Sequence, residues 1–91
     1  MASTLDRAVH AEPIQEPIVV HATHQGGRVF PQSFVWQLRT FPVDAINGQW
    51  EDRDGGFKRF HFSIQSADET YYLYLRTEDM VWILDQVMLD G

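Results

Sequence analysis

The sequence predicts an all-β fold: an antiparallel meander of five or six strands that forms a small curved sheet or open barrel, with a disordered N-terminal arm. Two observations carry this prediction. Apolar and polar residues alternate with a period of two over residues 57–65 and again over 70–77. Short β-branched or aromatic runs elsewhere are bounded by glycine, asparagine and aspartate, which favour turns. Closing a small sheet on itself protects its edges, which favours the barrel-like form.

The first expected elements are an arm and a hairpin. Residues 1–16 hold few large apolar side chains, so we expect them to form a flexible N-terminal arm, and residues 17–91 to form a single small β domain. The β-branched run IVVHA at 18–22 favours a strand. The turn-forming QGG and a second short run, RVF, follow it, and Pro31 is expected to end that run.

A second pair of strands is expected around the aromatic stretch FVWQLRTF. SFVWQ predicts a strand and TFPVDAI the returning strand, with a tight turn at Leu38 and Arg39 between them. The returning strand is expected to end at Asn47-Gly48, a strong turn dipeptide. Because proline cannot donate to a strand ladder, either the strand that holds Pro42 is expected at an edge of the sheet, or the nitrogen of Pro42 is expected to face away from the neighbouring strand.

The clearest alternation lies in the second half of the chain. After the turn signals DRDGG at 52–56, the segment 57–65 places apolar residues on one face and polar residues on the other. The segment 70–77 alternates in the same way, although its second face carries two tyrosines. The two segments therefore predict a pair of adjacent strands.

The last segment, 78–90, fits two structures. Thr77 is a good helix cap, and the acidic residues that follow it suit the first turn of a helix. A strand fits equally if a bulge near Asp85-Gln86 restores the alternation. We prefer the strand because it continues the meander.

The aromatic residues are expected to be mainly structural. The side chains assigned to the barrel core are Phe34, Trp36, Trp50, Phe60, Phe62, Leu73, Leu75 and Trp82. Replacing Trp36 or Phe62 by alanine is therefore expected to cost roughly 3–5 kcal/mol of folding free energy.

Several short stretches occur in an order that is typical of a known family. They are FVWQ (34–37), Arg39, FPV (41–43), Trp50, FHF (60–62), YLYL (72–75), WIL (82–84) and Val87. On these stretches, about residues 30 to 89, the chain resembles a small bacterial domain family of unknown function with the pattern F-x-W-x-G-R-x-Y-x-V, then a tryptophan, then W-x-L-x-x-V. The resemblance implies no catalytic residues. Some members of that family are encoded near translesion DNA polymerases.

Two positions depart from the family pattern. Leu38 stands where the family usually has glycine in its tight turn, and glycine tolerates a positive φ angle that leucine does not. Phe41 stands where the family usually has tyrosine, so no role of that hydroxyl is carried over to this chain.

Composition restricts the function. The chain holds no cysteine, which excludes disulfides, thiolate nucleophiles and cysteine-type zinc sites. Its first residues lack the apolar run of a secretory signal, so a cytoplasmic protein is expected. Residues 1–43 hold three acids and three bases, so the formal net charge of −6 arises entirely from residues 44–91. This acidity disfavours nucleic acid and membrane surfaces as partners.

The sequence gives only weak evidence for a catalytic or metal-binding site. No converging set of catalytic groups stands out, so we expect no enzyme and no cofactor. His21, His24 and His61 are weak candidates for a three-nitrogen metal site. Residues three apart on a strand point to opposite faces, however, so the first two would need a bend between them. A metal- or small-ligand-binding domain is therefore the second alternative.

The main candidate surface is one face of two adjacent strands. Its residues are Arg59, His61, Tyr72, Tyr74 and Arg76. Tyrosine and arginine are enriched at protein interfaces, so we expect a non-enzymatic protein-interaction module. Its partner is expected to be a protein, with a second copy of the chain in a homodimer as one form. The first alternative is a nucleic-acid-associated accessory domain that stacks bases on this aromatic face.

Overall fold

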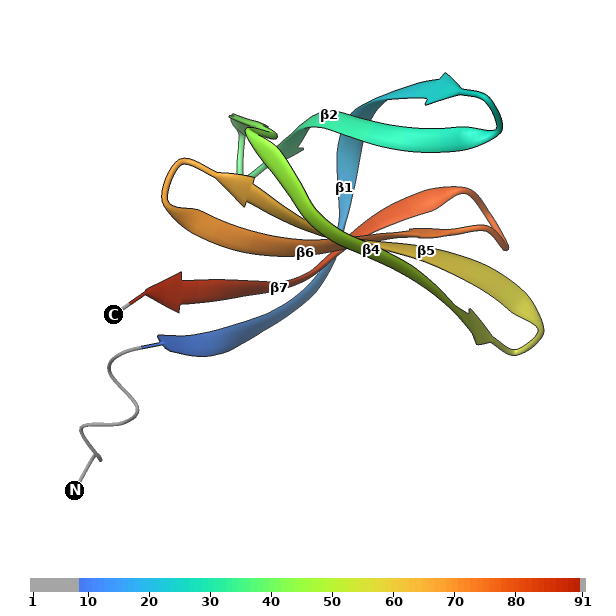
Figure 1. Ribbon diagram of the computed structural model, residues 1–91. Coiled ribbons are helices and arrows are strands. Elements are labelled where there is room, and N and C mark those ends of the chain that lie inside the picture. Colours follow the sequence, from blue (N-terminus) through green and yellow to red (C-terminus); the bar gives the residue numbers. More distant parts are fainter. Residues whose placement is uncertain (1–8, 91) are drawn as a thin grey trace.

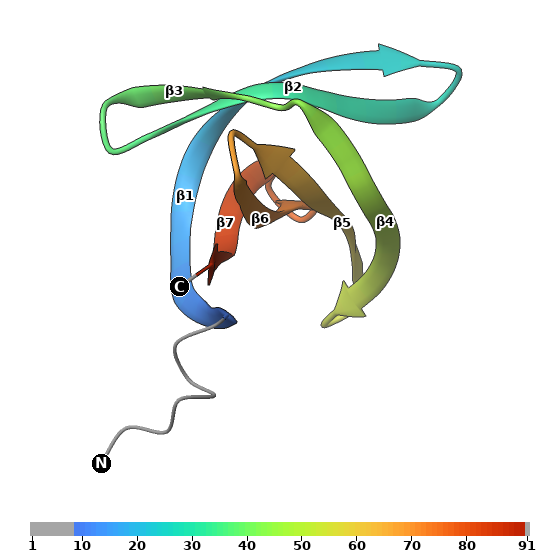
Figure 2. The same cartoon turned by 60° about the vertical axis from the view of Figure 1, so that its left-hand side comes forward.

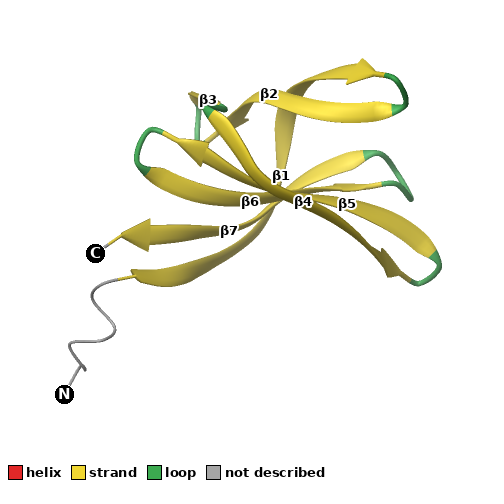
Figure 3. Cartoon of the chain, viewed as in Figure 1, coloured by secondary structure: helices red, strands yellow, loops and turns green. Residues whose placement is uncertain are grey.

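The computed structural model describes residues 9–90 and shows one antiparallel sheet of seven strands (Figure 1, Figure 3). The strands are β1 (Val9–Gln25), β2 (Arg28–Trp36), β3 (Arg39–Pro42), β4 (Ala45–Asp54), β5 (Phe57–Ser66), β6 (Glu69–Arg76) and β7 (Val81–Asp90). Their order in the sheet is β3-β2-β1-β7-β6-β5-β4, so β3 and β4 form the two edges. The all-β class and the curved antiparallel sheet are confirmed, but the strands number seven rather than five or six. Over these residues, no helix is long and apolar enough to cross a membrane.

The long strand β1 makes the sheet curl. Its first part, Val9 to Ile18, pairs with β7, and its second part, Val19 to Gln25, pairs with β2. The sheet therefore bends along β1, and the seven strands form a half-barrel (Figure 2). We call the inside of this half-barrel the concave face and the outside the convex face.

Strand β1 begins before the expected end of the N-terminal arm. The arm was predicted to cover residues 1–16, but Val9 to Glu16 belong to β1 and pair with β7. Residues 1–8 lie outside the described residues. The physical reason is that β7 needs a second neighbour, and Ile14 packs against the core from this part of β1. Pro13 within this segment and Pro17 directly after it hid the strand from the sequence pattern.

Pro31 does not end a strand as predicted, because β2 runs through it. Ser33 pairs with His21 and Pro31 pairs with Ala22, so Gln32 is an extra residue that forms a bulge. A bulge is one of the few places in a sheet that tolerates a proline, since the ladder is already interrupted there.

Asn47-Gly48 is also not the predicted turn. The pairing of β4 with β5 shifts between Ile46 and Gly48, so Asn47 forms a bulge inside a ten-residue strand. The hairpin turn lies further on, at Gly55 and Gly56, whose φ angles are 61° and 94°. Two adjacent residues with positive φ give the turn geometry that matches strand twist.

The turn between β2 and β3 lies one residue earlier than predicted. It is formed by Gln37 and Leu38, with φ angles of 52° and 63°, and Arg39 already belongs to β3. Leucine therefore occupies the left-handed conformation that glycine adopts at less cost. Pro42 lies on the edge strand β3, as expected.

The last segment is a strand, as preferred. β7 pairs with β6 and with the first part of β1. Tyr72 pairs with Gln86 and Leu73 with Leu84, so Asp85 is an extra residue and the bulge predicted at this point is confirmed.

The core lies on the concave face. Its buried members are Phe34, Phe62, Ile64, Tyr71, Leu73, Leu84 and Val87. Phe34 from β2 meets Tyr71 from β6 at a ring distance of 5.2 Å, so the core joins opposite sides of the half-barrel. The prediction for Trp50 is wrong: it lies on the convex face and is 48% exposed. Trp36 is only partly buried, and its indole N–H donates to Glu16.

Candidate functional site

The five candidate residues of β5 and β6 share the convex face. Arg59 pairs with Arg76 and His61 with Tyr74, so the four lie in two neighbouring cross-strand rows. Tyr72 stands on the next row, opposite Ser63. The structure therefore brings all five side chains to one surface.

His61 is the centre of a row of rings across β4, β5 and β6. Its ring stacks on Trp50 at 5.2 Å with an angle of 8°, and lies 5.1 Å from the ring of Tyr74. Its Nε2 is 2.9 Å from Oδ1 of Asp52. His61 and Tyr74 are buried although they lie on the convex face, because these contacts cover them. Most of the surface of both rings is therefore in contact with other side chains of the same chain.

The arginines of this face are also engaged. Arg59 donates two hydrogen bonds to the carboxylate of Asp52, at 2.8 and 2.6 Å, and its guanidinium lies 5.2 Å from the ring of Tyr74. Arg76 makes the same two-point contact with Asp79, at 2.9 and 2.8 Å. The hydrogen bonds from Arg59 and then from His61 lower the pKa of Asp52 to about 2. Both arginines therefore present balanced rather than free charge.

A polar link ties the convex face to β1. The hydroxyl of Tyr74 donates to the side-chain oxygen of Gln15 at 3.3 Å, and the amide of Gln15 donates to Asp85. Gln15 has a φ of 55° and lies in the bulge of β1. These contacts further restrict Tyr74 as a free binding group, and the accessible aromatics of this face are Tyr72, Trp50 and Phe57.

The three histidines considered for a metal site lie on two parts of the sheet. His21 and His24 are exposed residues of β1 that pair with Ser33 and Val29 of β2. His61 lies on β5 against Asp52. No group of three or more histidine, aspartate or glutamate side chains is placed to hold a metal ion within the described range 9–90.

The half-barrel is open between β2 and β4. Residues 28–31 of β2 pair with β1 on one side, whereas β3 pairs only with residues 33–36. In the described part of the chain β4 pairs only with β5. Two unpaired strand edges therefore face each other across the opening, and Figure 2 shows the β1–β2 hairpin apart from the β4–β5 hairpin.

The opening is closed at one end. There the chain passes from β3 to β4: the backbone N–H of Val43 donates to the carbonyl of Gln32, and that of Asp44 donates to the carbonyl of Gln65. These bonds hold the beginning of β4 against β2 and β5. The opening is consequently a wedge that widens toward the Gly26-Gly27 and Gly55-Gly56 turns.

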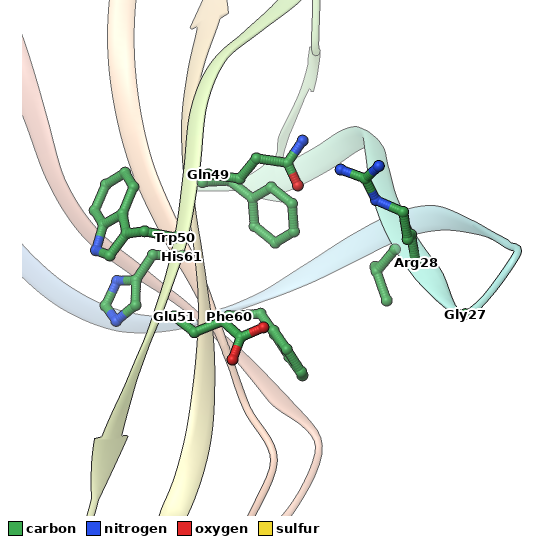
Figure 4. Close-up of a pocket in the computed structure, with 9 residues that line it drawn as sticks. Gly27, Arg28, Gln49, Trp50, Glu51, Phe60 and His61 are labelled. Carbon is green, nitrogen blue, oxygen red and sulfur yellow. The ribbon is translucent and has the colours of Figure 1, made fainter.

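A cavity of about 330 Å³ occupies this wedge. Its walls are Gly27, Arg28, Val29, Gln49, Trp50, Glu51, Phe60, His61 and Phe62. In Figure 4, Gln49, Glu51 and Phe60 project to the side of Arg28, whereas Trp50 and His61 project to the opposite side of β4 and β5. The two groups meet at β4, so this edge strand borders both the cavity and the convex face.

Of the two charged side chains in the cavity wall, one has an ion-pair partner and the other does not. Arg28 contacts the ring of Phe30 at 5.6 Å, and no carboxylate among residues 9–90 pairs with it. Glu51, the acid in the wall, lies 3.6 Å from the ammonium of Lys58. The cavity therefore offers one unbalanced positive group above an apolar floor.

A second cavity, of about 480 Å³, lies at the other end of the sheet beside β3. The guanidinium of Arg39 covers the ring of Phe41 at 4.9 Å there, and burial raises the pKa of the Tyr71 hydroxyl. The other polar residues of its wall are Thr40, Asp44, Ser66 and Glu69.

Sequence reasoning missed the wedge and its residues. Arg28 and Gln49 carry no motif, and their proximity depends on the curl of the sheet and on two bulges that the alternation did not indicate. The one available signal was the run of exposed polar residues around Trp50, which does not fit a paired central strand.

Comparisons with known proteins add no identity. No protein-family model matches the chain, and neither a curated protein nor a solved structure matches it.

Proposed function

We propose that this protein is a non-enzymatic interaction module that binds an extended segment of a partner protein along edge strand β4. The observation that carries the proposal is the wedge between β2 and β4, where two unpaired strand edges share one cavity. An added strand gains main-chain hydrogen bonds from such an edge and side-chain contacts from a pocket beside it.

The spacing supports the insertion of one strand. A cavity of about 330 Å³ lies between residues 28–29 of β2 and residues 49–51 of β4, whereas paired strands lie about 4.8 Å apart. A segment between them therefore has room to pair with β4, and its inward side chains would lie over Phe60 and Phe62. Trp50, exposed at the same edge, would contact its outward side chains.

The partner is proposed to be a different protein rather than a second copy. Each copy carries a formal net charge of −6, and β4 itself contains Glu51, Asp52 and Asp54 against Arg53. Pairing β4 with β4 of another copy would bring like charges together, which disfavours a sheet that continues through the dimer.

Nucleic acid is the weaker candidate. Base stacking on the convex face would need free cations to hold the phosphates, and Arg59 and Arg76 are each bound to a carboxylate. The ring row of His61 and Tyr74 is buried by its own neighbours.

The proposal is tested by selecting peptides from a random library and mapping the best binder onto the labelled chain by NMR. We expect changes at residues 28–31 and 45–51. Two proline variants, Gln49→Pro and Trp50→Pro, test the pairing directly. Successive N–H groups of β4 point alternately to β5 and to the free edge, so one of the two variants removes an N–H group at the free edge and leaves the pairing with β5 intact. The variant that remains folded should no longer bind, and Trp50→Ala controls for the lost ring. Binding that survives proline in a folded variant would contradict strand addition.

A further inference from the structure

We infer that the cavity between β2 and β4 receives the carboxyl-terminal residue of the partner segment, with its carboxylate at Arg28 and its apolar side chain on Phe60 and Phe62. The inference rests on the proposed function and adds the chemistry of the partner. Three features of the wedge carry it: an unbalanced cation, a closed end and an apolar floor.

The cation is Arg28. Its guanidinium has no carboxylate partner within residues 9–90, unlike Arg59 and Arg76, and in Figure 4 it is directed across the cavity toward Gln49. Arginine and an amide N–H₂ both donate hydrogen bonds, and arginine binds a carboxylate at two points. The negative charge of Glu51 is balanced by Lys58 at 3.6 Å, so it opposes an incoming carboxylate only weakly.

The closed end favours a chain terminus over a chain that passes through. The bonds of Val43 and Asp44 to Gln32 and Gln65 close the wedge where β4 begins. A segment that enters from the wide end must stop before this point or bend out of the sheet. A terminal residue meets this restriction without any bend.

The strand directions select the carboxyl terminus. Neighbouring strands are antiparallel throughout the sheet, and β4 runs from the closed end toward the wide end. A segment antiparallel to β4 therefore runs toward the closed end, and when it stops in the cavity, before that end is reached, its last residue lies at Arg28 and Gln49. Antiparallel addition is the more stable pairing for an edge strand.

The floor and size of the cavity define the last side chain. Phe60 and Phe62 from β5 and Val29 from β2 form an apolar surface. A volume of about 330 Å³ is at the small end of ligand pockets, which span roughly 300–1,000 Å³. It suits one branched apolar residue with its carboxylate better than a long ligand.

The test uses N-acetyl-leucine, which reproduces a carboxyl-terminal leucine, and N-acetyl-leucinamide, which lacks the charge. Each is titrated into the full-length labelled chain, and amide shifts are followed by NMR. We expect the acid to shift residues 27–29 and 49–51 and to bind about five- to tenfold more tightly than the amide, as a two-point contact to an exposed arginine allows. The preference should shrink as salt is raised.

Substitutions identify the group responsible. Arg28→Gln should remove the preference for the acid, and Arg28→Lys should retain part of it, since lysine keeps the charge but not the two-point geometry. Arg39→Gln removes the same charge at the second cavity and should leave the preference intact.

The outcomes separate the inference from the proposed function. Equal binding of acid and amide, or shifts of neither kind at the cavity, would overturn the carboxylate site. Selected peptides that bind along β4 with an amidated end would leave the proposed function standing. A preference that persists in Arg28→Gln would also overturn the assignment, because the carboxylate would then be held by another group.

Discussion

The convex face over β4, β5 and β6 and the wedge between β2 and β4 share strand β4 but use their polar groups differently. On the convex face, Asp52 binds both Arg59 and His61, and the rings of His61 and Tyr74 are buried by their neighbours. In the wedge, Arg28 and the edge of β4 have no such partners among the described residues. A surface rich in tyrosine and arginine can therefore be structural. The wedge beside it holds fewer such residues but carries the unpaired arginine and the unpaired strand edge.

The largest difference in the free energy of unfolding is expected between a substitution in the core and one on the convex face. Phe34 is fully buried and stacks on Phe41 at 5.0 Å, so Phe34→Ala should lower the free energy of unfolding by about 3–5 kcal/mol. Trp50→Ala removes a larger but half-exposed ring and should cost about 1 kcal/mol. Urea unfolding followed by circular dichroism measures both. Equal losses would mean that Trp50 is a core residue after all.

A smaller effect tests whether the convex face is structural. His61→Ala removes the stack on Trp50, the contact with Tyr74 and the bond to Asp52. We expect a loss of about 2 kcal/mol, from the aromatic contacts and a charge-assisted hydrogen bond. His21→Ala, at an exposed position of β1, is the matched control and should change stability little. If both variants are equally stable, the ring row does not support the fold.

The turn between β2 and β3 belongs to neither surface. A substitution there therefore measures the effect of backbone conformation on stability, without any change in either surface. Leu38 has a φ of 63° and is 99% exposed, so its side chain loses no packing when removed. Leu38→Gly should raise the free energy of unfolding by about 0.5–1 kcal/mol, because glycine adopts this conformation at less cost. Leu38→Ala keeps the strained conformation and should not stabilise the chain. A gain of the same size with alanine would point to the exposed side chain instead.

The smallest expected effect is the pH dependence of the convex face. The pKa of Asp52 is about 2 against an ordinary value of 3.8, chiefly through its hydrogen bond from Arg59, and Arg76 likewise lowers the pKa of Asp79. The contribution of Asp52 to stability is present above its ordinary pKa of 3.8 and is lost as the pH falls through about 2, and that of Asp79 is lost in the same direction. Melting temperatures between pH 6 and 2 should therefore fall less steeply in Asp52→Asn than in the unchanged chain. Asp68→Asn removes one acid from an exposed turn and should not flatten the curve.

The sequence predicted the parts of the fold that follow from local alternation. The strands around Phe62 and Leu73 and the bulge at Asp85 could be predicted because one side chain in two faces the core. The bulges at Gln32 and Asn47 could not, because proline and Asn-Gly are stronger turn signals than strand signals, and tertiary pairing overrode them.

The sequence predicted which residues share the candidate surface, but not which of them are already bound by neighbouring side chains. Alternation alone brings Arg59, His61 and Tyr74 to one face, but it does not reveal that Asp52 and Asp79 occupy the arginines. Those partners come from a neighbouring strand and from a turn. The wedge depends on the curl of the whole sheet along β1, which no local pattern encodes.

The measurement that tests the central claim most directly is an NMR map of a library-selected peptide on the labelled chain. The account predicts shifts at residues 28–31 of β2 and 45–51 of β4, with the convex residues Tyr72 and Arg76 unchanged. Shifts confined to Tyr72, Arg76 and their neighbours on β5 and β6, with the wedge unchanged, would contradict it and return the binding role to the convex face.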